Sequence, residues 1–459
     1  MMMNSPVACN HAVQRLPPAS ADLATAWAFL EEAIDHIMTR PQTAISYSEF
    51  MGLYTMAYHY CTSSRKHSGS VASNSGLDRG NHRGPCSDLY NNLIRYFVTH
   101  LEGLREQSDL LQDETLPRYY AGEWARYTSG ANYVNPLFVR LNRVWVKRER
   151  DRGRKTIYPV YILALVLWKT NFCSHMQSDL TGAILRLVER QRNGETIDQN
   201  LVKKVVDSFV SLGLDNTDIN KTSLDFYREH LEIPFLGATE KYYEQESKVF
   251  LVENSISDYL KKVQERLQEE EDRADRYLNA ETREQLISKC EHVLIRRHAQ
   301  LMWESFQTLL DHDRDDDLQR MYALLSRIPE GLEPLRKRFE EHVKKAGQTA
   351  ISKLVGEGTD GLVSSTAYMN ALLDVQLKNS VTVSRCFKGD AMFVTSFDKA
   401  CRELMNRNVA TGTSATESPE LISRFEFGAR IIRKTTTECA EKMAGDALAL
   451  LAPEGAEIG

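Results

Sequence analysis

Apolar side chains recur at intervals of three or four residues along most of this chain, from Asp22 to Arg407. This spacing places them on one face of an α-helix, whereas a half-buried strand would need strict alternation. Convincing runs of such alternation are absent, and glycine and proline are few. The sequence therefore predicts an all-α fold. The first two expected helices carry the spacing on Leu23, Trp27, Leu30, Ile34 and Ile37, and on Phe50, Leu53, Tyr54, Ala57 and Tyr60 or Cys61.

The helical part divides into three blocks of similar size, at residues 20–160, 161–280 and 281–407. Each block would hold about five helices at ordinary helix and loop lengths. Helical units that contact only their neighbours stack into a solenoid, so we expect an elongated solenoid. Later helices are expected at residues 257–278, 282–310 and 331–354.

Three segments have a different composition from these blocks. Residues 62–87 are rich in Ser, Gly, Asn and Arg and offer almost nothing to bury, so they predict a disordered loop inside the first block. Residues 1–19 are expected to be a disordered N-terminus. Residues 408–459 are expected to be a linker and a divergent tail, with short helices at 421–433 and 444–451.

The segment Leu141–Trp168 shows how one expected unit meets the next. An aromatic and apolar helix face runs into a dense charged run, and Gly153 then breaks the pattern before a second, nearly all-apolar helix. The segment contains no nucleophile–base pair, metal-ligand spacing or phosphate loop. It therefore favours a scaffold over a catalyst.

Composition is that of an ordinary soluble protein. The chain has 57 Lys and Arg against 63 Asp and Glu, for a net charge of −6, which gives no global reason to bind nucleic acid. Its eight cysteines are scattered without a CxxC pair, which suggests a reducing compartment. No signal peptide is recognisable, and the apolar run Val160–Trp168 is too short to span a membrane. We expect a soluble intracellular protein, in cytoplasm and nucleus, without membrane contact.

Two charged clusters suggest binding sites, but neither has the residues that such a site needs. Residues 311–317, DHDRDDD, lack the Gly and Glu that an EF-hand needs, because Asp316 and Tyr322 stand at those positions. We expect a solvated acidic loop there. The basic run 147–155 contains Glu149 and Asp151, which should pair with its own arginines. We therefore expect no catalytic residues, no metal, no cofactor and no nucleic-acid partner, and predict that the chain is not an enzyme.

The expected second helix is unusually aromatic. Residues 46–60 read SYSEFMGLYTMAYHY, and one helix cannot bury aromatic rings around its whole circumference. Each ring could fill the core of the first block. Alternatively, some of them form a protein-binding face, where Tyr and Met are enriched.

Several motifs resemble cullins of the SCF ubiquitin-ligase class, with a fungal-looking pattern. The resemblance covers about residues 20–425 in the same order throughout. It is carried by FMGLYTMAYHYCTS, by residues 141–168, and by ERQRNGETID, SLGL, FYREHLEIPFLGATEKYYEQES, RMYALLSRIPEGLEPLRKRFEEHV, FVTSFDKACRELMNRN and SPEL. It implies a stalk of three five-helix cullin repeats. It also implies a non-catalytic scaffold that binds a Skp-type adaptor, which carries an F-box substrate receptor.

The resemblance also implies which residues bind that adaptor. On the second helix they are Phe50, Met51, Leu53, Tyr54, Ala57 and Tyr58, and on the fifth helix they are Leu137, Arg140 and Arg143. Two positions depart from the family. Arg140 stands where the family usually has an aromatic residue. Pro136 lies within the expected helix, where a proline costs about 3 kcal/mol unless it occupies the first turn.

The family pattern breaks off after Arg424, before the cullin-homology domain that holds the RING subunit. We therefore expect a short form that retains the receptor end and does not recruit a RING subunit. An alternative reading frame, a truncated gene model and a real short paralogue would each produce this sequence. A different class of function is an α-solenoid tethering protein without a ubiquitin role, resembling exocyst-type stalks.

Overall fold

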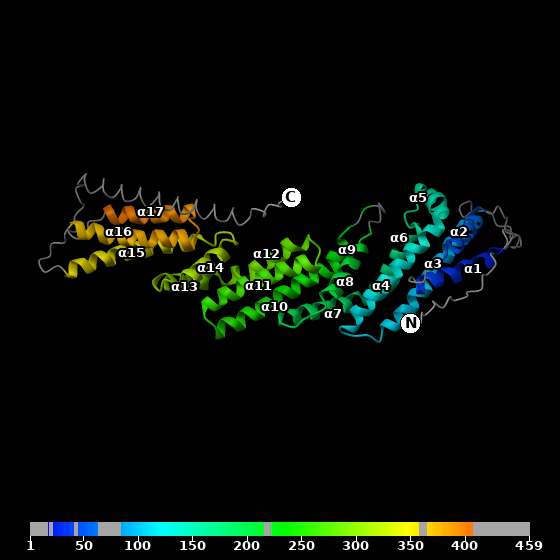
Figure 1. The fold of residues 1–459 in the computed structure, drawn as a ribbon, viewed down its shortest axis with the longest axis horizontal. Helices are drawn as coiled ribbons and strands as arrows, with labels where there is room; N and C mark the ends of the chain where they lie inside the picture. Colours follow the sequence, from blue (N-terminus) through cyan, green and yellow to red (C-terminus); the bar gives the residue numbers. More distant parts are fainter. Residues whose placement is uncertain are drawn as a thin grey trace, which may run out of the picture. The chain divides into compact units, whose positions relative to one another are not determined.

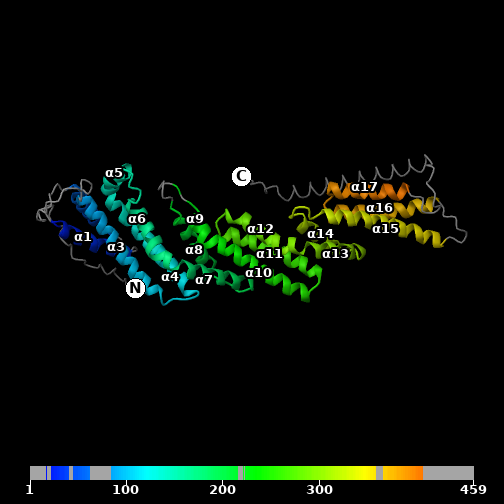
Figure 2. The same ribbon diagram turned by 180° about the vertical axis from the view of Figure 1, so that it is seen from behind.

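The computed structural model describes residues 17, 22–40, 45–62, 84–214, 221, 223–357 and 365–406. Every regular element in these ranges is a helix, so the prediction of an all-α fold is confirmed (Figures 1 and 2). The expected N-terminal segment apart from Pro17, most of the expected loop at 62–87 and the expected tail at 408–459 lie outside the described residues.

The chain forms two compact units. Unit 1 comprises residues 1–238 and 273–283, and unit 2 comprises residues 239–272 and 284–459. Two long helices, α10 (Ile233–Glu253) and α11 (Ile256–Tyr277), contribute residues to both units. The division into three repeats therefore stays a prediction.

Unit 1 begins with four helices: α1 (Leu23–Thr39), α2 (Tyr47–Thr62), α3 (Pro85–Ser108) and α4 (Thr115–Val134). A capping box starts α2. The Ser46 backbone N–H donates to Glu49 Oε2 at 2.9 Å, and the Glu49 N–H donates back to Ser46 Oγ at 3.3 Å. These reciprocal bonds satisfy two donors that the first helical turn leaves free. The aromatic helix therefore begins at a fixed residue.

The helical path continues beyond α4 without a loop. It passes through the 3₁₀ turn η1 (Asn135–Phe138) and the π-helical stretch η2 (Leu141–Val146) into α5 (Lys147–Asp151). Gly153 follows with a φ of 89°, in the left-handed region that ends helices, so the expected break is confirmed. The remaining elements of unit 1 are α6 (Val160–Leu167), the π stretch η3 (Trp168–Cys173), α7 (Ser174–Arg192), α8 (Gln199–Ser211), α9 (Asp225–Tyr227) and the π stretch η4 (Arg228–Glu232).

The core of unit 1 is a cluster of aromatic rings around Trp168. Tyr120, Trp124, Tyr127 and Phe172 all have ring centroids within 5.7 Å of Trp168. The Trp168 indole N–H donates to the Tyr120 hydroxyl at 3.3 Å, and Ser208 on α8 donates to the same hydroxyl at 3.1 Å. Buried polar groups need such partners, so the cluster joins α4, α8 and η3 through packing and hydrogen bonds together.

Unit 2 holds α12 (Thr282–Leu294) apart from its first two residues, which belong to unit 1. It also holds η5 (Arg296–His298), α13 (Ala299–Asp311), α14 (Asp315–Leu325), α15 (Glu333–Glu357), α16 (Ser365–Cys386) and α17 (Ala391–Asn406). The expected single helix at 282–310 was wrong, because a 3₁₀ turn separates α12 from α13. Neither glycine nor proline marks this turn. Ile295, just before it, is fully buried, so packing sets the break.

The acidic segment 311–317 also differs from the expectation of a solvated loop. Its last three aspartates form the first turn of α14, where negative charge is favourable. Asp317 is buried and pairs with Arg314 at 2.9 Å and with Arg320 at 3.1 Å. The cluster is therefore partly structural.

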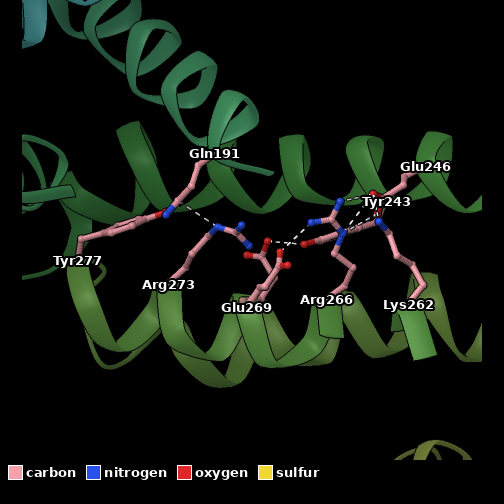
Figure 3. A network of polar contacts seen from close by, with 9 residues as sticks. Gln191, Tyr243, Glu246, Lys262, Arg266, Glu269, Arg273 and Tyr277 are labelled. Carbon is pink, nitrogen blue, oxygen red and sulfur yellow. Dashed lines mark hydrogen bonds and ion pairs between the residues drawn. The ribbon is translucent and has the colours of Figure 1, made fainter. Parts of the chain in front are cut away.

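Buried polar contacts surround α11 in both units (Figure 3). In unit 2, Arg266 donates to both oxygens of Glu246 on α10 and to Glu269 at 2.7 Å, and the Tyr243 hydroxyl donates to Glu270 at 2.6 Å. In unit 1, Gln191 Oε1 accepts from Arg273 and Tyr277 (Figure 3). These bonds provide partners for charged and polar side chains that are buried among the apolar faces of the helices.

The packing of α1 on α4 leads to a first prediction. A Cβ at Gly130 would lie 2.8 Å from Met38 Sδ and 3.0 Å from Met38 Cα. Gly130→Ala should therefore destabilise the protein by about 1–3 kcal/mol through overpacking. Urea unfolding followed by circular dichroism measures this change.

The matched control is Gly122→Ala on the same helix, where an added Cβ meets nothing within 4 Å. That substitution should stabilise by about 0.5–1 kcal/mol, because Ala is the better helix former. Equal effects at the two glycines would contradict the observed approach of α1 to α4.

Candidate partner-binding surface

The α2 helix has two different faces. Leu53, Met56, Ala57 and Tyr60 are buried against the rest of unit 1. Met51 and Tyr58 are exposed, and Phe50 and Tyr54 are half-buried on the outward side. The alternative of core or surface is therefore resolved ring by ring, with Tyr60 in the core and Tyr58 outside. We call Phe50, Met51, Tyr54 and Tyr58 the α2 surface.

The predicted residues of the fifth helix lie in η1, η2 and the residues between them. Leu137 is buried, whereas Arg140 and Arg143 are exposed. The Arg140 guanidinium carbon lies 5.4 Å from the centre of the Tyr58 ring, and the Tyr58 and Tyr54 rings lie 6.5 Å apart. The structure thus brings Arg140 and the α2 surface together, as neighbours from segments about eighty residues apart in sequence.

Three of the residues implied by the family resemblance are buried rather than displayed. Leu53, Ala57 and Leu137 have at most 4% of their surface exposed. Their side chains hold α2 and the following helical stretch in place, so any direct contact with a partner falls to their exposed neighbours. Arg140 also has a role that its departure from the aromatic pattern did not suggest, since its guanidinium covers the face of Tyr58.

Pro136 is accommodated by a change in hydrogen bonding rather than by a break. It occupies the first turn of η1, where the Val139 N–H donates to the Pro136 carbonyl in 3₁₀ fashion. The following π stretch has the Lys147 N–H donating to the Asn142 carbonyl. A proline lacks the donor that an α-helix interior needs, and these local alternatives avoid that requirement. Arg140 therefore lies between the 3₁₀ and π stretches, and Arg143 lies within the π stretch.

Sequence reasoning missed the two asparagines that tie this stretch to α6. Asn142 Nδ2 donates to Asn135 Oδ1 at 3.0 Å. The backbone N–H of Val160 donates to Asn142 Oδ1 at 3.0 Å, and that of Tyr161 donates to Asn135 Oδ1 at 3.3 Å. The pair thus caps α6 from a distance. The two asparagines stand seven residues apart, on the same side of a helix, but this spacing does not reveal that they bond to the start of α6.

Positive charge lies beside the surface, and part of it is neutralised internally. Glu149 is buried and pairs with Arg148, Arg152 and Arg154 at 3.0–3.4 Å. The prediction of pairing with arginines of the same run is confirmed for Glu149, and for Asp151 it stays a prediction. Val144 and Lys147 are exposed near Arg140 and Arg143. Sequence reasoning did not select Val144, although its helical spacing from Arg140 placed it on the same side.

Two further observations concern other kinds of site. Across the described ranges, no three or more His, Cys, Asp or Glu side chains are arranged to hold a metal ion. No helix in the described part of the chain is long and apolar enough to cross a membrane.

Helices packed on helices, with an outward aromatic face on one of them, are the features of a protein of the α-solenoid class. The sequence matches the family described as the cullin alpha solenoid domain over residues 27–448. This match extends beyond Arg424, so the expectation that the family pattern breaks off there was wrong. The chain belongs to the cullin family.

Curated relatives support this membership. The chain is 41% identical to Cullin-1 of Dictyostelium discoideum over 408 residues, which cover 88% of this chain and 53% of that protein. It is 36% identical to Cullin-1 of Schizosaccharomyces pombe, over 89% of this chain and 53% of the relative. For Cullin-1 of Caenorhabditis elegans the identity is 33%, over 88% and 54%. The chain spans about half the length of the curated relatives it matches.

The asparagine pair gives a second prediction. Asn142→Ala removes an acceptor from the Val160 N–H and a donor from Asn135, and should destabilise unit 1 by about 1–2 kcal/mol. The control is Asn91→Ala, at an exposed position of α3, which should change stability by less than about 0.5 kcal/mol. Thermal and urea unfolding measure both. A neutral Asn142→Ala would mean that solvent caps α6 equally well.

The contact between Arg140 and Tyr58 gives a third prediction, tested by a double-mutant cycle. Arg140→Ala and Tyr58→Ala, singly and together, should show a coupling free energy of unfolding of about 0.5–1 kcal/mol. The control cycle pairs Tyr58→Ala with Arg118→Ala, near the start of α4, and should show additive effects. Additivity in both cycles would show that the stacking contributes nothing in solution.

Proposed function

We propose that this chain acts as a scaffold stalk of a cullin-RING ubiquitin ligase, and that the α2 surface with Arg140 and Arg143 binds a Skp-type adaptor carrying an F-box receptor. The single observation that carries the proposal is the two-faced α2 helix. Its buried side anchors it in unit 1, and its outward side displays Phe50, Met51, Tyr54 and Tyr58. Aromatic and methionine side chains are the types enriched in protein interfaces.

The geometry suits an interface that forms without reorganisation. Leu53 and Ala57 fix the rotation of α2, and the capping box at Ser46 fixes its start. Arg140 lies over Tyr58 and Tyr54 lies beside it, so the rings have neighbours before any partner arrives. Side chains that are ordered in advance lose less conformational entropy on binding. Arg140 in addition offers charged donors at the edge of the aromatic face, which suit an acidic partner.

In this proposal the chain performs no chemistry itself. A scaffold accelerates a transfer by holding the substrate receptor and the catalytic module at a restricted separation, which raises their effective concentration. The helical units supply spacing, and the α2 surface supplies attachment of the receptor. Cullin family membership and the Cullin-1 relatives support this role.

A fourth prediction tests adaptor binding. The double variant Phe50→Ala, Tyr54→Ala removes two aromatic anchors and should weaken binding to the adaptor–F-box complex by about 2 kcal/mol or more, roughly thirtyfold. Isothermal titration calorimetry on the purified chain measures the affinity.

The control variant is Leu110→Ala, Val252→Ala, which removes two exposed aliphatic side chains outside the α2 surface. It should leave the affinity unchanged. Circular dichroism establishes that both double variants are folded. A folded Phe50→Ala, Tyr54→Ala variant with undiminished affinity would remove the α2 surface from the adaptor interface.

A further inference from the structure

Two cysteines meet where α2 ends and α3 begins. Cys61 lies in the last turn of α2, and Cys86 is the second residue of α3. Cys86 Sγ lies 3.5 Å from the Cys61 carbonyl oxygen, to which its thiol donates. Both residues are half-buried, whereas Cys173, Cys290, Cys386 and Cys401 are buried. This pair is therefore both close together and open to a small reagent.

The two thiols are chemically unequal. The pKa of Cys86 is lowered, first because its thiolate accepts a hydrogen bond from Cys61 and then because Arg148 and Arg140 are positively charged nearby. The pKa of Cys61 is raised, first by its hydrogen bond with Cys86 and then by burial. Cys86 also stands in the first turn of α3, where helix N–H groups favour a negative charge. Cys86 is thus suited to be the attacking thiolate, and Cys61 the second thiol.

We propose that Cys61 and Cys86 form a peroxide-sensitive dithiol that closes reversibly into a disulfide between α2 and α3. The Cys86 thiolate attacks one oxygen of hydrogen peroxide, the O–O bond breaks, and hydroxide leaves to become water. The resulting Cys86 sulfenic acid is attacked by the Cys61 sulfur. The S–S bond forms and a second water leaves with the Cys61 proton. Two thiols are oxidised and one peroxide is reduced. A small dithiol reverses the bond by exchange.

The position of the pair connects it to the α2 surface. Cys61 follows Tyr58 by three residues, which is one helical turn. Arg140, whose guanidinium lies over Tyr58, is also one of the positive charges that act on both cysteines. Oxidation removes the thiolate that attracts Arg140 and fixes the last turn of α2 to α3. The inference does not require that the α2 surface bind an adaptor, and its test uses the chain alone.

The experiment maps the bond directly. The reduced full-length chain is treated with a small molar excess of hydrogen peroxide, its remaining thiols are blocked with N-ethylmaleimide, and peptides are analysed by mass spectrometry without reduction. The expected main product is the Cys61–Cys86 linked peptide pair, lighter by two hydrogens than the separate peptides and lost on treatment with dithiothreitol. No linked pair, or links spread evenly over the cysteines, would overturn the proposal.

Single variants test the separate roles. In Cys61→Ser, Cys86 should stop at the sulfenic acid, which dimedone traps. In Cys86→Ser, Cys61 should remain a thiol under the same dose. The control Cys386→Ser, at a buried cysteine, should form the Cys61–Cys86 link at the wild-type rate. Alkylation by iodoacetamide at neutral pH should modify Cys86 about tenfold faster than Cys61. Equal rates, or a sulfenic acid at Cys61 in the Cys86→Ser variant, would contradict the assignment.

Discussion

The indole of Trp168 is fully buried in unit 1, and the packing of the surrounding helices depends on it. Rings from α4 and η3 surround it, and its N–H is satisfied by the Tyr120 hydroxyl, which Ser208 of α8 also contacts. An aromatic side chain of this size buries a large apolar area, but its polar edge must find a partner inside. Tyr120 packs its ring against the indole and accepts a hydrogen bond from its N–H, so one hydroxyl connects α4, α8 and η3. The position of α4 follows from this cluster.

Everything proposed for the partner surface depends in turn on α4 and its continuation. Gly130 lets α4 approach α1, and the helical path then passes Pro136 by changing from α to 3₁₀ and π hydrogen bonding. Arg140 lies between the 3₁₀ and π stretches, where its guanidinium reaches Tyr58. Irregular helical turns often occur at functional positions because they redirect side chains that a regular helix would place elsewhere. Here Arg140 lies next to the α2 surface, over the ring of Tyr58.

The α2 helix carries both proposals, through different parts of its length. Its middle turns present the rings proposed to bind an adaptor, and its last turn carries Cys61 opposite Cys86. Arg140 is the physical link between them, because one guanidinium acts on the Tyr58 ring and on the two sulfur atoms. A change in the charge of the cysteine pair would therefore alter the electrostatic environment within one helical turn of the α2 surface.

The sequence by itself determined the all-α fold, because the spacing of apolar residues is a local property that each helix expresses alone. It also determined the break at Gly153 and the family, since the motifs extend over most of the chain. Only the tertiary structure decided which rings of α2 face outward. Phe50, Tyr54, Tyr58 and Tyr60 share about half of the circumference of one helix. Their spacing alone does not say which ring faces the core, and the packing of neighbouring helices places Tyr60 there. Likewise, the break after Ile295 and the pairing of Cys61 with Cys86 depend on contacts between distant residues, which no local pattern in the sequence records.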